Sequence, residues 1–156
     1  MVVQVAVCGP GSCTEEDAAH AYRIGQLLAE RGVVVICGGG TGVMAAVAAG
    51  VRDRDGLVIG IRPGDTRDGA SPDLSAAILT GLGEARNAVI VASADAVIVV
   101  GGSWGTLSEV ALAMARGRPV ISLGGWRIVD PDGRPVEGAT HVTTPEEAVD
   151  RAVDHR

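Results

Sequence analysis

Short runs of branched apolar residues alternate along this chain with longer segments in which apolar residues recur at helical spacing. A short apolar run bounded by turn residues is typical of a strand that is buried on both faces of a parallel sheet. We therefore expect six strands, at residues 2–8, 33–37, 57–61, 74–79, 97–100 and 120–123. The run at 120–123 is expected to be the last strand of the sheet.

The segments between the expected strands predict helices. We expect them at residues 14–31, 43–50, 83–92 and 106–116, and from residue 144 onward. The last helix has a strong start signal, because Thr144 suits the cap, Pro145 the first position and Glu147 the third. Thr106 and Glu109 have the same capping-box spacing, which predicts the start of the fourth helix.

Strands that alternate with helices indicate an α/β fold, in which a mostly parallel sheet is covered on both faces. The chain has no internal repeat and no linker, so residues 1–156 are expected to form a single domain. The polar segment 62–73 is too long for a tight connection, and we expect it to be a loop over a site. In the turn-rich segment 124–142, the sequence DPDG at 130–133 predicts a hairpin.

Two of the expected strands end in glycine-rich turns that lead directly into a helix. The sequence GGGTG occupies residues 38–42, and GGSWG occupies residues 101–105. Glycines let the backbone approach a ligand closely, and a helix start directs free N–H groups toward an anion. Because ligands of parallel sheets bind outside the carboxyl ends of the strands, we expect both turns to contribute to one phosphate-binding site.

Residues 40–45, GTGVMA, match the G-x-G-x-x-A fingerprint of dinucleotide-binding proteins. The match follows the second strand, and Arg62 stands at the end of the third strand, where a dinucleotide site requires a ribose-binding acid. We therefore interpret the turn as a cradle for a mononucleotide or a phosphate and not for NAD. The chain contains no G-K-[ST] sequence, which excludes a P-loop nucleotide hydrolase.

Of four candidate side chains, three have two interpretations each and one has a single interpretation. Glu109 either takes part in chemistry or caps its helix, which contributes about 0.5–2 kcal/mol. Arg86 either contacts a ligand or lies on a solvated helix face. Its neighbour Asn87 is a poor helix former, which favours a local role. Trp104 either forms the wall of a base-binding site or covers the glycine turn.

Composition narrows the class of partner. The chain is 47% hydrophobic with 2% aromatic residues, so its core must consist of Val, Ile, Leu and Ala. The formal net charge is −6 and no basic cluster stands out, which argues against nucleic acid as a partner. No long apolar run is present, so neither a signal peptide nor a membrane-spanning helix is expected.

The cysteines and histidines show no metal-binding or disulfide spacing. The cysteines are Cys8, Cys13 and Cys37, and the histidines are His20, His141 and His155. An odd number of cysteines without a framework is typical of reduced thiols, which indicates a cytoplasmic protein. Cys8 and Cys37 end apolar runs, where a cysteine usually acts as a small buried hydrophobic residue. No metal site is expected.

Three motifs together resemble the LONELY GUY family of phosphoribohydrolases, which belongs to a Rossmann-like superfamily of nucleotide-binding proteins. They are GGGTGVM at 38–44, Arg86-Asn87 ahead of SADA at 93–96, and GSWGTLSE at 102–109. The resemblance implies a Rossmann-like three-layer αβα fold, a homodimer, no cofactor, and a catalytic pair formed by Arg86 and Glu109. The substrate-binding residues that it implies are Gly39, Gly40, Thr41, Gly42, Asn87, Gly102, Ser103, Trp104, Gly105 and Thr106.

The chain departs from the family motif P-G-G-x-G-T-x-x-E at two positions. Gly101 stands in place of the proline and Ser103 in place of the second glycine, while Asn87 replaces a lysine elsewhere. In these positions the sequence is closer to a compact bacterial subgroup that also resembles molybdenum-cofactor carrier proteins.

Two functions therefore stay open. One is hydrolysis of the N-glycosidic bond of a nucleoside 5′-monophosphate, which releases the base and ribose 5-phosphate. The other is binding of a nucleotide or of the molybdenum cofactor by a carrier without catalysis. Decarboxylation is excluded, because a pyridoxal enzyme needs a Schiff-base lysine and this chain contains no lysine.

Overall fold

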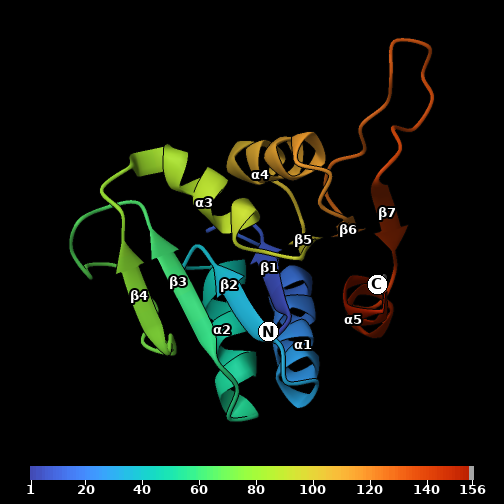
Figure 1. Ribbon diagram of the computed structural model, residues 1–156. Coiled ribbons are helices and arrows are strands. Elements are labelled where there is room, and N and C mark those ends of the chain that lie inside the picture. Colours follow the sequence, from blue (N-terminus) through green and yellow to red (C-terminus); the bar gives the residue numbers. More distant parts are fainter. Residues whose placement is uncertain (155–156) are drawn as a thin grey trace.

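A computed structural model describes residues 1–154, so that His155, one of the scattered histidines, lies outside the described residues. Seven strands form one sheet in which all neighbouring strands are parallel, in the order β4-β3-β2-β1-β5-β6-β7 (Figure 1). Their bounds are β1 (Gln4–Cys8), β2 (Val34–Cys37), β3 (Val58–Arg62), β4 (Ala76–Leu79), β5 (Ala96–Val100), β6 (Val120–Leu123) and β7 (Ala139–Val142).

Helices follow most of the strands and cover both faces of the sheet. They are α1 (Glu15–Glu30), α2 (Val43–Asp53), α3 (Arg86–Ala92), α4 (Trp104–Ala115) and α5 (Pro145–Val153), with a short 3₁₀ helix, η1 (Gly83–Ala85), ahead of α3. Within residues 1–154, no helix is both long enough and apolar enough to cross a membrane.

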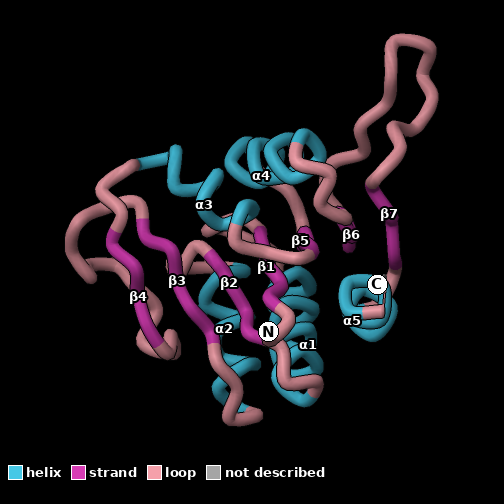
Figure 2. Tube along the Cα trace, in the orientation of Figure 1, coloured by secondary structure: helices cyan, strands magenta, loops and turns pink. Residues whose placement is uncertain are grey.

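The central strand β1 shows why the domain has three layers. Side chains alternate along a strand, so Val5 and Val7 point to one face of the sheet while Ala6 and Cys8 point to the other. The first face packs against α1, α2 and α5, and the second against α3 and α4 (Figures 1 and 2). The expected three-layer αβα fold is thereby confirmed.

The strand order reverses next to β1, and this reversal positions the site. From β1 the chain crosses to β2 on one side, while β5 lies on the other side of β1. The loops after β1 and β5 therefore diverge and leave a crevice at the carboxyl ends of these strands, where ligands of such sheets bind. The glycine turns after β2 and β5 both lie at the carboxyl ends of the strands.

The structure differs from the predicted elements at the far end of the sheet. The prediction that residues 120–123 form the last strand is wrong, because β7 pairs in parallel with β6. The β7 sequence ATHV is short, polar and half-exposed, so it lacks the apolar run by which the other strands were found. The predicted hairpin is confirmed: Val129 pairs with Pro135, and the Gly133 N–H donates to the Asp130 carbonyl at 2.9 Å.

Candidate functional site

A polar cavity of about 130 Å³ lies at the carboxyl ends of β1, β2 and β5, between these strands and helices α3 and α4. It collects residues from five separate segments of the chain. Its lining consists of Cys8, Gly9, Gly11, Gly38, Met44, Arg86, Asn87, Ser103, Gly105, Thr106 and Glu109. Six of the twelve residues implied by the resemblance are in this lining, including both members of the expected catalytic pair.

Helix α4 begins earlier than the capping-box pattern predicted. Ser103 is its N-cap, because the Ser103 hydroxyl accepts the Thr106 N–H at 3.2 Å and lies 2.9 Å from the Thr106 hydroxyl. Glu109 is consequently in the second turn of the helix and not at its third position. The interpretation of Glu109 as a helix cap is wrong, and capping does not explain its presence.

The Glu109 side chain instead points to the sheet, where the residue is only 7% exposed. Burial raises the pKa of Glu109 to about 7, although a hydrogen bond from the Cys8 thiol and the positive charge of Arg86 both favour the ionised form. The carboxyl group therefore changes its charge near neutral pH. Acids of this kind, set in a cavity beside a cation, are typical of functional sites.

Arg86 is held by the strands and does not lie on a solvated helix face. Its Nη1 donates to the carbonyl oxygens of Gly38 and Ile61, both at 2.7 Å, and its Nε donates to Oδ1 of Asn87 at 2.9 Å. Asn87 is fixed in turn by its own donation to the Ser108 hydroxyl at 3.1 Å. Among the described residues no acceptor bonds the two N–H groups of Arg86 Nη2, so they are available to a ligand.

A second guanidinium, Arg62, lies beside Arg86 and was not among the predicted site residues. Its Nη1 donates to the same Gly38 carbonyl at 3.3 Å, and its Nη2 to the Asp68 carbonyl at 3.3 Å. Burial lowers the pKa of Arg86 most, Glu109 raises it, and the charge of Arg62 lowers it. Two guanidinium groups therefore share the Gly38 carbonyl, and only Arg86 of the two acts on the pKa of the Glu109 carboxyl group. The local excess of positive charge favours an anionic ligand. The position of Arg62 at the end of β3 was the available sequence signal.

The glycine turn after β2 lies beside the cavity and packs against the loop after β1. Gly39 and Gly42 have φ angles of +74° and +63°, and a Cβ atom on Gly42 would lie 2.4 Å from the Pro10 carbonyl oxygen. The Thr41 hydroxyl donates to the Gly11 carbonyl at 2.8 Å, and Gly40 packs against Arg62. Residues 39–42 thus shape the turn, while the cavity itself is lined by the flanking Gly38 and Met44.

The loop after β5 has a conformation that its sequence explains. Gly101 has a φ of +67°, which the proline of the family motif cannot adopt. A Cβ atom on Gly102 would lie 2.9 Å from Trp126, whose indole N–H donates to the Ser103 carbonyl at 2.8 Å. Trp104 packs against Trp126 with ring centroids 4.9 Å apart and ring planes inclined by 35°, and Trp104 is itself 76% exposed.

Trp104 also borders a second hollow that adjoins the cavity. This hollow has a volume of about 170 Å³ and shares Asn87 and Gly105 with the cavity lining. Its remaining walls are Glu84 and Ser108. The smaller cavity holds the charged side chains of Arg86 and Glu109, and the adjoining hollow is bordered by the exposed indole of Trp104.

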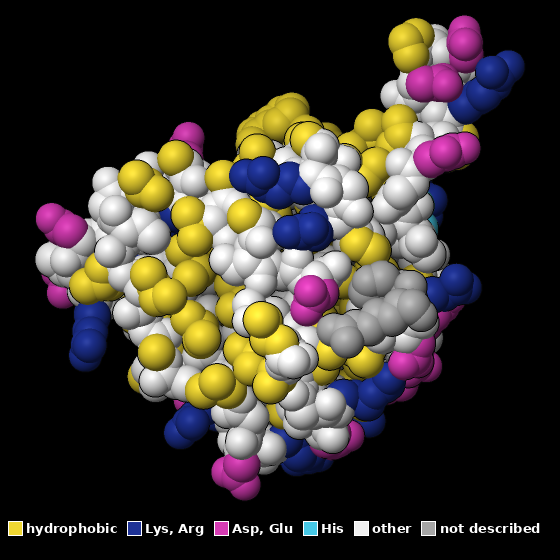
Figure 3. All heavy atoms as spheres, viewed as in Figure 1, with side chains coloured by type: hydrophobic (Ala, Val, Ile, Leu, Met, Phe, Trp, Pro, Cys, Tyr) yellow, Lys and Arg dark blue, Asp and Glu magenta, His cyan; other side chains and the backbone are white. Residues whose placement is uncertain are grey.

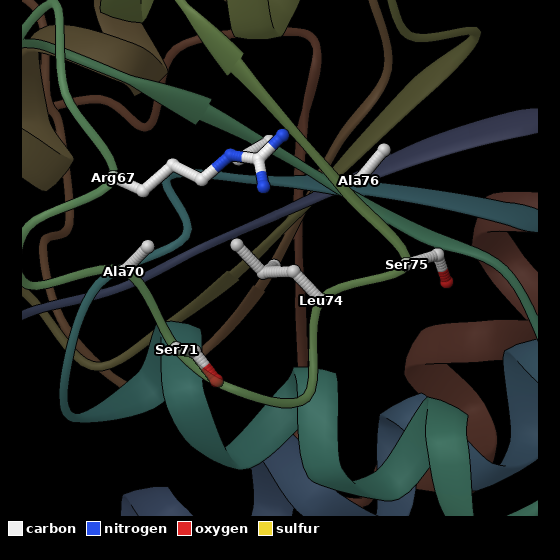
Figure 4. Close-up of a pocket in the computed structure, with 7 residues that line it drawn as sticks. Arg67, Ala70, Ser71, Leu74, Ser75 and Ala76 are labelled. Atoms are coloured by element: carbon white, nitrogen blue, oxygen red, sulfur yellow. The ribbon is translucent and has the colours of Figure 1, made fainter.

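A larger hollow of about 400 Å³ lies at the outer edge of the sheet, between β4 and the loop that precedes it (Figure 4). The Arg67 side chain extends toward Ala76, and Leu74 also lines the hollow. None of the predicted site residues lines it. The loop itself is tied to the outer side of the glycine turn, because the Ser71 N–H donates to the Gly39 carbonyl at 2.8 Å. No residue from 62 to 73 lines the 130 Å³ cavity.

Within residues 1–154, no three His, Cys, Asp or Glu side chains gather in a way that suits a metal ion.

A parallel sheet whose switch point carries a cavity between glycine turns defines a Rossmann-like α/β domain, as the motifs predicted. The chain belongs to the SLOG cluster4 family, whose model matches residues 2–149. It is 42% identical over 152 residues to an uncharacterised protein of Archaeoglobus fulgidus. The matched region covers 97% of this chain and 95% of that protein.

Other relatives represent both functions that the sequence left open. A probable cytokinin riboside 5′-monophosphate phosphoribohydrolase of Oryza sativa is 33% identical over 108 residues, which are 66% of this chain and 44% of that protein. The molybdenum cofactor binding protein of Rippkaea orientalis has 35% identity and a TM-score of 0.86, with 96% of this chain and 94% of that chain covered. The molybdenum cofactor carrier protein of Chlamydomonas reinhardtii has 27% identity and a TM-score of 0.84, with 99% of this chain and 98% of that chain covered. The expected membership of a LONELY GUY-like subgroup close to such carriers is confirmed.

Proposed function

We propose that this protein binds a nucleoside 5′-monophosphate at the switch-point cavity and hydrolyses its N-glycosidic bond. The observation that carries the proposal is the buried Glu109 carboxyl group, which lines the same cavity as Arg86. An acid with a pKa near 7 is costly to keep in a protein interior, and the cap that would have justified it is absent. The similarity to a probable phosphoribohydrolase supports the reaction type.

In this proposal the phosphate is bound at the positive side of the cavity. The two N–H groups of Arg86 Nη2 and the first-turn N–H groups of α4 are donors suited to phosphate oxygens. The 5′-phosphate thereby fixes the ribose near Glu109. The base extends to the adjoining hollow, where Trp104 presents an exposed ring face for stacking.

Cleavage of the bond between C1′ and the base nitrogen leaves the electron pair on the base and positive charge at C1′. The ionised Glu109 carboxylate stabilises that charge in a site of low dielectric constant. A water molecule then adds its hydroxyl group to C1′, and the released proton goes to the base. Because the carboxylate form is required, kcat/KM is expected to rise with pH through about 7, the pKa of Glu109.

The direct test is release of free base from a panel of nucleoside 5′-monophosphates, followed by chromatography. Glu109→Gln keeps the size of the side chain and a hydrogen-bond acceptor for Cys8, so the fold is expected to stay intact. Turnover is expected to fall by roughly a hundredfold or more, because the carboxylate charge is lost. Glu15→Gln, an exposed acid on α1, serves as the matched control and should leave turnover unchanged. Undiminished base release by Glu109→Gln would remove the catalytic role.

A carrier function is the second candidate, and the similarity to two molybdenum cofactor binding proteins over nearly the whole chain favours it. The same cavity would then hold a phosphate-bearing cofactor or nucleotide without cleaving it. Equilibrium binding of members of the panel with complete recovery of intact nucleotide would favour the carrier. Binding followed by release of base would favour the hydrolase.

A further inference from the structure

Cys8 occupies a position at the site that neither the sequence pattern nor the proposed reaction uses. It is the last residue of the central strand β1 and pairs with Val99 of β5, so it lies at the point where the strand order reverses. Its side chain faces α3 and α4, is 2% exposed, and lines the cavity together with Arg86 and Glu109. The thiol hydrogen-bonds the Glu109 carboxyl group.

The backbone that carries Cys8 is tightly packed where β1 ends. A Cβ atom on the following residue, Gly9, would lie 2.5 Å from Cγ1 of Val43 and 2.6 Å from the Val100 carbonyl oxygen. The backbone after Cys8 is therefore clamped between α2 and β5, with no room for a larger residue. The position of the Cys8 Cβ atom at the end of β1 is therefore well defined.

We propose that Cys8 is a positioning residue, whose S–H group donates to the Glu109 carboxylate and keeps that side chain oriented in the cavity. This inference rests on the proposed function, in which Glu109 acts as a carboxylate. The thiol is suited to the task because it stays neutral: burial, and then the charge of Glu109, raise the pKa of Cys8 well above its ordinary value. A neutral thiol donates a hydrogen bond, whereas a thiolate would repel the carboxylate.

The other charged and titratable groups around Glu109 act differently. Arg86, on α3, favours the ionised carboxylate through its charge. Arg62 on β3 acts on the pKa of Arg86, and Cys37 on β2 acts on that of Cys8. The Cys8 S–H bond is thus the one directional contribution to Glu109 among these groups, and it can be removed without changing any charge.

The test measures the ionisation of Glu109 without substrate, by ¹³C NMR of protein labelled in the glutamate side-chain carboxyl, with Glu109→Gln identifying the signal. Cys8→Ala removes the donor and is expected to raise the titration midpoint by about one pH unit. Cys8→Ser restores a donor and should return the midpoint to the wild-type value or below it. The matched control is Cys37→Ala, a buried thiol at the end of the neighbouring strand that packs on the opposite face of the sheet.

The pH profile of kcat/KM is expected to shift with the titration midpoint of Glu109. Cys8→Ala should be several-fold slower than wild type at pH 7 and recover at higher pH. An unchanged midpoint in Cys8→Ala, or an equal shift in Cys37→Ala, would overturn the inference. A midpoint that moves as expected in a protein that cleaves no nucleotide would refute the proposed hydrolase function and leave the role of Cys8 toward Glu109 standing.

Discussion

A buried carboxyl group such as that of Glu109 makes the stability of the protein depend on pH. Its pKa in the folded state, about 7, lies above the ordinary value of 4.5, so the folded protein holds this proton more tightly than the unfolded chain does. The stabilisation from this group is therefore complete below pH 4.5 and is lost as pH rises through 7. The loss amounts to about 3 kcal/mol, from 1.36 kcal/mol per unit of pKa difference.

Glu109→Gln should remove this pH-dependent loss of stability. We expect the variant to exceed the wild type in free energy of unfolding by about 1–3 kcal/mol at pH 8, and to differ little at pH 5. Urea unfolding at the two pH values measures the difference, and Glu15→Gln, an exposed acid, should follow the wild type. If wild type and Glu109→Gln changed in parallel between pH 5 and pH 8, Glu109 would be ionising in an ordinary environment.

At the residue scale, sequence patterns located the site better than they explained it. Arg86 and Glu109 were singled out by resemblance, since by spacing alone each had an ordinary structural explanation. Ser103 and Thr106 are both good capping residues, and the pattern could not tell which of them begins α4. Arg62 was missed because it reaches the site through the Gly38 carbonyl, which lies 24 positions away in the sequence.

At the scale of elements, the turn after β2 joins the fold to the site. Gly42 combines a positive φ with close contact to the loop after β1, and its neighbour Val43 donates its N–H to the Pro10 carbonyl at 3.1 Å. The turn, the loop after β1 and the start of α2 therefore form one packed unit. A side chain at Gly42 must displace all three.

Gly42→Ala is accordingly expected to destabilise the protein by roughly 2–4 kcal/mol, through backbone strain and steric overlap together, and to weaken nucleotide binding at least tenfold. Gly117→Ala is the matched control, because Gly117 has a similar φ of +67° but a Cβ atom there would meet no atom of the described residues within 4 Å. It should lose about 1 kcal/mol from strain alone and bind normally. Thermal unfolding and calorimetric titration give the two quantities, and equal losses in both variants would contradict the role given to the Pro10 contact.

Most of the elements that sequence patterns predicted well share one property, an apolar pattern imposed by burial, which is a continuous run in the strands and helical spacing in the helices. Strands β1, β2, β3 and β5 and helix α1 were found near their observed positions because burial demands such a pattern. Helix α5 was found from its start signal, in which Thr144 is the N-cap. Strand β7 was missed because its pairing with β6 is set by tertiary contact and not by local composition.

At the scale of the whole molecule, one edge of the sheet is left uncovered. Ile78 on β4 is 49% exposed, Leu79 is 38% exposed and Leu82 is 53% exposed. Figure 3 shows hydrophobic side chains gathered over the part of the molecule that contains β3 and β4. An apolar edge strand is a template for association, and the resemblance implies a homodimer, so we expect a second copy to cover this edge.

Ile78→Asp should then convert the dimer to a monomer of 15.7 kDa, because it buries a charge at the interface. Val129→Asp is the matched control, since Val129 is 55% exposed on the hairpin, away from β4. Analytical ultracentrifugation distinguishes the two states. A wild type that is already monomeric, or dissociation by Val129→Asp and not by Ile78→Asp, would contradict this expectation.

We propose that the cavity between β1, β2, β5 and helices α3 and α4 receives a nucleoside 5′-monophosphate. The most direct measurement is a crystal structure of Glu109→Gln with a nucleoside 5′-monophosphate that the wild type binds in solution. We predict that the phosphate contacts Arg86 Nη2 and the start of α4, with C1′ beside residue 109 and the base near Trp104. A nucleotide bound elsewhere, with this cavity empty, would contradict the account.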